Sequence, residues 1–242
     1  MGMFDNVVSS DDVQQEKDSI HRGFSALPSD LYKLAIKKAY VTKAKSGAVA
    51  VNIVFATAEG KEIRMQEYVL SGDAKGNKNY YEKDGIKYFL PGYNQINALA
   101  LLTVGKELPQ LKTEKQKIML YSYDAGQEVA TEVDVFTELT NKVILAGVLH
   151  TIEDKTKKDD NTGKYEPTGE TREINTIDKF FHPESKKTVA EIKGKADAVF
   201  VDKWVEAWKD KINDTSTKDK QKGEKGLPEA TNKQDKKENP FM

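Results

Sequence analysis

Three strand-like runs joined by short glycine-containing turns constrain the fold of this 242-residue chain most strongly. Residues 32–41 alternate between apolar and polar side chains, residues 48–56 are apolar and rich in β-branched side chains, and residues 61–70 alternate again. Connections this short join antiparallel neighbours, because parallel strands need a much longer crossover. We therefore predict an antiparallel meander over these three segments.

The alternation in the first run also predicts which side chains share a face. We expect Tyr32, Leu34, Ile36 and Tyr40 on one face, and Lys33, Lys37 and Val41 on the other. Residues 32–72 hold seven cations against three acids, a local net charge of +4 within a chain whose formal net charge is −1. The meander is therefore expected to carry a basic surface.

The rest of the chain predicts one folded domain with a terminal segment on either side. Residues 1–31 are polar and acidic and are expected to form an N-terminal arm. Residues 32–212 are expected to fold, with a helix at 93–105, strands at 117–123, 130–139, 142–154 and 171–181, and a helix at 197–212 that packs through Trp204 and Trp208. The polar connection 155–169 is expected to be a long mobile loop. Residues 213–242 have few large apolar side chains, so we predict a disordered tail whose removal leaves the fold intact.

Several enzyme classes lack their residues in this sequence. The chain has no cysteine, which excludes disulfides, iron–sulfur clusters and cysteine nucleophiles. Its three histidines lack metal-ligand spacing. The glycine-rich stretch 72–78 lacks the Gly-Lys-Ser/Thr end of a phosphate-binding loop. We predict no catalytic residue, no metal and no cofactor. A nuclease built on an unrecognised carboxylate cluster stays open as an alternative.

Aromatic and basic residues gather between residues 75 and 93. This segment holds five aromatic residues and four lysines, interspersed with glycines. A protein that binds single-stranded nucleic acid without reading its sequence needs cations for the phosphates and flat rings on which the bases stack. The segment supplies both. The alternative is a turn-rich hairpin whose aromatic side chains enter the core.

The order of these features resembles the single-stranded DNA-binding proteins of tailed bacteriophages, which have an oligonucleotide-binding (OB) fold. The resemblance rests on residues 35–48, 69–78, 80–94 and 175–181, and spans roughly residues 5–210. It implies a mainly β protein: a five-stranded antiparallel barrel with long hairpins, accessory helices and a disordered C-terminal tail. It also implies a role in DNA replication, recombination and repair.

On this resemblance we assign the DNA-binding residues by type. The rings expected to stack on bases are Tyr80, Tyr81, Tyr88, Phe89 and Tyr68. The cations expected to contact phosphates are Lys37, Lys43, Lys45, Arg64, Lys75, Lys78 and Lys87. Pro240 and Phe241 match a tip with which related tails recruit phage or host replication proteins. Here a methionine follows that tip, and residues 213–242 hold seven lysines against six acids.

The main alternative function is a non-enzymatic phage interaction or structural protein that binds another protein through the same aromatic loop. Location is predicted from what the sequence lacks. No apolar run approaches the ~20 residues of a membrane helix, and the N-terminus lacks signal-peptide features. We expect a cytoplasmic protein, which the resemblance places in the infected host cell, with no membrane partner.

Overall fold

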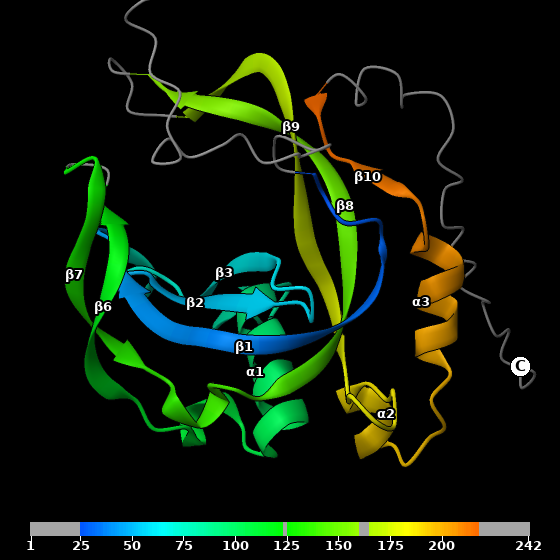
Figure 1. The fold of residues 1–242 in the computed structure, drawn as a ribbon. Coiled ribbons are helices and arrows are strands. Elements are labelled where there is room, and N and C mark those ends of the chain that lie inside the picture. Colours follow the sequence, from blue (N-terminus) through cyan, green and yellow to red (C-terminus); the bar gives the residue numbers. More distant parts are fainter. Residues whose placement is uncertain (1–24, 123–124, 160–164, 218–242) are drawn as a thin grey trace, which may run out of the picture.

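The computed structural model describes residues 25–122, 125–159 and 165–217 (Figure 1). Most of the predicted arm, residues 1–24, and the predicted tail beyond residue 217 lie outside the described residues, as do Pro240 and Phe241. The described part is mainly β, with antiparallel sheets and few helices, as predicted.

The elements follow one another in a fixed order along the chain. The meander is β1 (Asp30–Lys43), β2 (Val49–Ala56) and β3 (Glu62–Leu70). Next come the single-turn helix η1 (Asp73–Lys75), a small hairpin of β4 (Tyr80–Lys83) and β5 (Ile86–Phe89), α1 (Pro91–Val104) and η2 (Leu108–Gln110). Then follow β6 (Glu114–Ser122), β7 (Gln127–Val135), η3 (Thr137–Leu139), β8 (Val143–Lys158), β9 (Tyr165–Phe181), α2 (Val189–Lys193), α3 (Phe200–Trp208) and β10 (Ile212–Asp214).

Five long strands form one antiparallel path in the order β3-β2-β1-β8-β9. β10 pairs with β8 in parallel, and β7 pairs with both β1 and β6. The two ends of the path, β3 and β9, approach each other without a hydrogen-bonded ladder. The sheet is therefore not closed in the described residues, in contrast to the closed barrel that we predicted.

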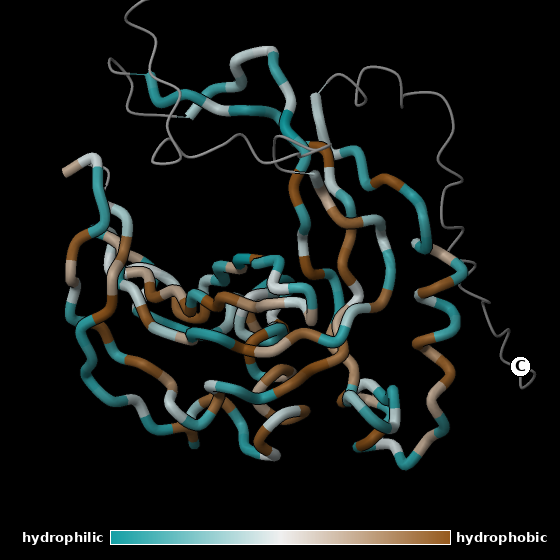
Figure 2. Tube along the Cα trace, viewed as in Figure 1, coloured by the Kyte–Doolittle hydropathy of each residue, from teal (hydrophilic) through white to brown (hydrophobic). Residues whose placement is uncertain are grey.

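The main core lies between this curved sheet and α1. Ile96 and Leu99 of α1 are fully buried with Ile53, Phe55 and Phe180 of the strands. Figure 2 shows brown, hydrophobic residues recurring along the strands near α1, whereas the outer part of the β8–β9 hairpin is largely hydrophilic. The helix therefore covers one side of the meander and leaves the opposite side to the exterior.

A second apolar cluster joins α3 to β8 and β9. Trp204 packs against Leu145, Leu149 and Phe181, and its indole nitrogen donates a 2.6 Å hydrogen bond to the Asp178 carboxylate. Trp204 is buried as the sequence analysis expected, and Trp208 is partly buried beside it. The helix is shorter than expected, because the backbone turns at Asp210 and residue 212 begins β10.

A β-bulge corrects the predicted faces of β1. The register slips between Ile36 and Lys38, so an extra residue enters β1 opposite β2. Ile36 and Ala39 are both fully buried, and Lys37 and Lys38 between them are both exposed. Beyond the bulge the alternation is inverted, so Tyr40 faces away from the core, whereas we predicted it on the face of Ile36.

Two further predictions are corrected by strand pairing. Much of the expected loop 155–169 is strand, because β8 runs to Lys158 and β9 begins at Tyr165. The expected tail does not begin at residue 213, because β10 pairs with β8, and the Thr215 N–H donates to the Ile152 carbonyl at 2.9 Å. Ser216 is only 3% exposed. Residues 213–217 therefore belong to the folded domain.

Candidate nucleic-acid interface

The β4–β5 hairpin, residues 80–89, carries four of the five predicted stacking rings; we call it the aromatic hairpin. Asp84 and Gly85 form its turn with φ values of 53° and 75°. A two-residue turn with both φ values positive matches the twist of antiparallel strands, and Asp-Gly is a favoured sequence for it. The hairpin is a separate two-stranded sheet, in which Tyr80 pairs with Phe89 and Tyr81 pairs with Tyr88.

The rings of this hairpin lie on the surface. Tyr81, Tyr88 and Phe89 are 45%, 43% and 53% exposed, and Tyr80 is half-buried. Tyr68 of β3 is also exposed. These residues therefore do not form the hydrophobic core, which was the alternative interpretation of the segment. Two isolated strands are only marginally stable by themselves, and apolar rings exposed in this way are typical of a binding surface.

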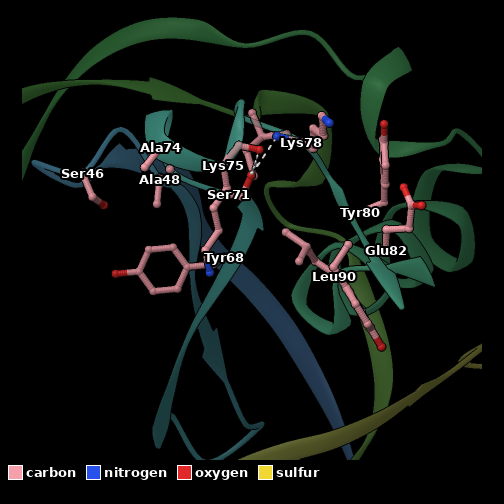
Figure 3. Close-up of a pocket in the computed structure, with 13 residues that line it drawn as sticks. Ser46, Ala48, Tyr68, Ser71, Ala74, Lys75, Lys78, Tyr80, Glu82 and Leu90 are labelled. Atoms are coloured by element: carbon pink, nitrogen blue, oxygen red, sulfur yellow. Dashed lines mark hydrogen bonds between the residues drawn. The ribbon is translucent and has the colours of Figure 1, made fainter. Parts of the chain in front are cut away.

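A cavity of about 600 Å³ lies at the base of the aromatic hairpin, and we call it the first cavity. Figure 3 shows Tyr68 on one side of it, with Lys78 and Tyr80 on the other. Its remaining lining residues are Ser46, Ala48, Leu70, Ser71, Gly72, Ala74, Lys75, Tyr81, Glu82 and Leu90. The structure thus brings together five of the predicted site residues: three tyrosines and two lysines.

Two lysines lie over the ring of Tyr80. The Lys87 and Lys78 ammonium nitrogens are 5.1 Å and 5.5 Å from its centroid. Such cation–π contacts hold positive charge beside an aromatic surface. An anion bound next to Tyr80 would therefore meet two cations. Glu82 is the one acid in the first cavity and opposes them.

The loop between β3 and the aromatic hairpin is fixed against the β1–β2 turn. The Asp73 N–H donates to the Ser46 carbonyl at 2.8 Å, and the Lys78 N–H donates to the Ser71 hydroxyl at 2.9 Å. A side chain at Gly72 would place its Cβ only 2.5 Å from the Ser46 carbonyl oxygen. Glycine is therefore required here, because the two loops pack backbone against backbone.

The outer side of β1, β2 and β3 extends this surface; we call it the sheet face. Strand register aligns Lys38 with Val54 and Arg64, and Thr42 with Ala50 and Tyr68. Directly opposed residues of neighbouring strands lie on the same side of a sheet. Tyr68 therefore belongs to both the sheet face and the first cavity, and it makes the two surfaces continuous.

A polar row crosses the middle of the sheet face beside Tyr40. The Asn52 amide donates to the Thr42 hydroxyl at 2.8 Å, and the Gln66 amide donates to the Asn52 carbonyl oxygen at 2.7 Å. Burial raises the pKa of the Tyr40 hydroxyl, and the nearby Arg64 guanidinium opposes that shift. The tyrosine is thus an uncharged, half-buried ring next to a cation.

The other predicted residues are spread around these surfaces. Lys37 is exposed at the bulge, and Arg64 is exposed on β3, 3.5 Å from the Glu62 carboxylate. Lys43 and Lys45 are exposed at the end of β1 and in its turn, outside the lining of the first cavity. Phe89 is not part of the first cavity, because its ring packs 5.0 Å from that of Tyr93.

Sequence reasoning missed Lys38 and Tyr40. Both lie on the sheet face because the bulge inverts the alternation, and no residue in 32–43 marks that bulge in the sequence. The clustering of cations at Lys37 and Lys38 was the one available signal for Lys38.

The described residues contain no group of three or more His, Asp or Glu side chains that could hold a metal ion. Within the same residues, no helix has the length and apolar character needed to cross a membrane.

The full chain matches no protein-family model and no curated protein.

Proposed function

We propose that this protein binds single-stranded DNA without sequence preference, through the first cavity and the sheet face. The observation that carries the proposal is the shared position of Tyr68, Tyr80, Tyr81, Lys75 and Lys78 around one open cavity. Rings and ammonium groups within reach of one another suit a ligand that alternates flat bases with phosphates. Such a protein needs no catalytic residue.

The arrangement of strands supports an OB fold as the scaffold. The path β3-β2-β1-β8-β9, with α1 inserted between β3 and β8, has the order and the helix position of that fold. In OB folds, nucleic acid binds on the face of the second and third strands and on the adjoining loops. Here these elements correspond to the sheet face, the β1–β2 turn and the β8–β9 hairpin.

The mechanism follows from mass action. A protein that binds the single strand and not the duplex lowers the free energy of the open form, so it melts helices without ATP. A phage protein with this activity would protect exposed strands during replication, recombination and repair. These roles rest on the sequence resemblance.

Fluorescence anisotropy with labelled oligo-dT, measured at several salt concentrations, tests the proposal. We expect binding to weaken as salt rises, with a slope of about 0.7 per phosphate contact in a plot of log affinity against log salt. A duplex of the same length should bind much more weakly. Equal affinity for duplex, or no binding at low salt, would contradict the proposal.

The second candidate is a protein-binding hairpin. Ile86 at the tip of the aromatic hairpin is 55% exposed, and an aliphatic side chain offers little to a base. If the hairpin binds a protein, oligo-dT should fail to bind at low salt. Pull-down with the hairpin variant Ile86→Asp as control should then identify a partner that the wild-type chain retains and the variant loses.

A further inference from the structure

A second cavity, of about 700 Å³, lies on the other side of the aromatic hairpin. It is enclosed by the end of β5, by α1 and α2, by β9 and by the start of α3. Three rings line it, those of Phe89, Tyr93 and Phe200, and two lysines, Lys179 and Lys193. Its volume is within the usual range for small-ligand sites.

The charges of the second cavity favour an anionic ligand. Of its two acids, Asp178 and Glu107, the first is already engaged by the indole N–H of Trp204 at 2.6 Å. In the part of the chain that the structure describes, neither Lys179 nor Lys193 has a carboxylate partner. These ammonium groups therefore remain available for an added anion.

The rings of the second cavity provide a flat surface next to those charges. The Lys179 ammonium nitrogen lies 5.3 Å from the centroid of Phe200, and Phe200 and Phe89 are both largely exposed. A nucleotide presents a flat base and a phosphate at a short distance from each other. The pairing of an open ring with a cation matches that chemistry, as it does in the first cavity.

The aromatic hairpin connects the two cavities. Tyr80, which lines the first cavity, is directly paired with Phe89, which lines the second. Side chains of directly opposed residues are about 5 Å apart at Cβ. A strand that crosses the hairpin at this pair thus passes from one cavity to the other without leaving aromatic surface.

We propose that the second cavity is an additional subsite for the same DNA strand, in which a nucleotide stacks on Phe200 and Phe89 and its phosphate lies near Lys179 and Lys193. This inference rests on the proposed function. It predicts that the bound strand bends around the aromatic hairpin, so that long oligonucleotides reach both cavities and short ones fill the first alone.

The test measures affinity for oligo-dT of increasing length, from about 4 to about 16 nucleotides. Phe200→Ala removes a ring, and Phe200→Tyr keeps one. Lys193→Ala removes a cation of the second cavity, and Lys203→Ala removes an exposed cation of α3 that lines neither cavity.

For long oligonucleotides, we expect Phe200→Ala to raise Kd by about 5- to 150-fold, the range for one lost stack, and Phe200→Tyr to bind like the wild type. Lys193→Ala should lower the salt slope by about 0.7, whereas Lys203→Ala should leave it unchanged. For the shortest oligonucleotides that bind, all four variants should match the wild type.

Two results overturn the inference, and they are distinguishable. If the wild type binds oligo-dT but Phe200→Ala and Lys193→Ala bind every length equally well, the second cavity is not part of the DNA path and is left for another ligand, such as a peptide. If the wild type binds no oligonucleotide, the proposed function itself fails. Circular dichroism of each variant shows whether a loss of binding reflects a loss of fold.

Discussion

Tyr81 and Tyr88 face each other across the two strands of the aromatic hairpin, with ring centroids 5.7 Å apart and ring planes 27° from parallel. Each ring covers part of one face of the other and leaves the remainder exposed. An aromatic pair held in this way is a rigid platform, because each side chain restricts the rotation of the other. A base that stacks on the pair would therefore order few additional side chains.

The first prediction tests this platform. Tyr81→Ala should weaken oligo-dT binding by about 1–3 kcal/mol, the range for one base–aromatic stack, and should leave the salt slope unchanged. Tyr81→Phe keeps the ring and is the matched control, so it should bind like the wild type. Fluorescence anisotropy at two salt concentrations separates the two effects. Wild-type affinity in Tyr81→Ala would exclude the pair as a stacking surface.

The second prediction concerns the cations over Tyr80. Lys78→Ala and Lys87→Ala should each lower the salt slope by about 0.7 if each lysine contacts one phosphate. Lys142, exposed in the turn before β8, lines neither cavity and provides the control. The measurement is a salt titration of oligo-dT affinity for the three variants. Equal slopes in all of them would mean that these lysines only shield the Tyr80 ring.

The elements with local signals could be predicted from the sequence. β2 and β3 begin one residue after the predicted positions and end where predicted, because alternation and glycine turns act over a few residues. α1 begins at Pro91, two residues early, since proline is favoured in the first turn of a helix. The exposure of the aromatic hairpin was consistent with the predicted site, although periodicity alone could not separate it from core packing.

The remaining features depend on tertiary contacts that leave little trace in sequence. The bulge at Lys37 is stabilised by packing on both sides of it, so simple alternation assigned Tyr40 to the wrong face. Parallel pairing of β10 with β8 joins residues about as far apart as 212 and 150, and a three-residue strand has no period to detect. For the same reason, sequence could not show that Phe89 lines a different cavity from Tyr80.

The third prediction concerns pH and the carboxylate of Glu191. The backbone N–H of Thr188 and those of Phe200 and Val199, at 2.8, 2.8 and 2.9 Å, donate to this carboxylate and lower its pKa from 4.5 to about 2. Because the pKa is lowered in the folded state, the ionised group stabilises the fold above about pH 4.5, and this stabilisation is lost as the pH falls towards 2.

Glu191→Gln should therefore lower the free energy of unfolding at pH 7, and the difference from wild type should shrink between pH 4.5 and pH 2. Urea denaturation at several pH values measures it. Glu184→Gln is the control, since Glu184 is exposed and has no ion pair among the described residues. A difference that stays constant with pH would show that Glu191 acts through shape and not through charge.

The fourth prediction locates the end of the folded domain. A chain that ends at Thr217 keeps β10, the hydrogen bond from Thr215 to Ile152 and the burial of Ser216, so it should unfold at the same urea concentration as the full chain. A chain that ends at Lys211 exposes the β8 edge and loses these contacts. Because each lost hydrogen bond costs about 0.5–1.5 kcal/mol, we expect its free energy of unfolding to fall by about 1–4 kcal/mol. Urea denaturation of the two truncated chains decides the question: equal midpoints would mean that β10 adds no stability, and that the boundary drawn from sequence near residue 213 was the energetically relevant one.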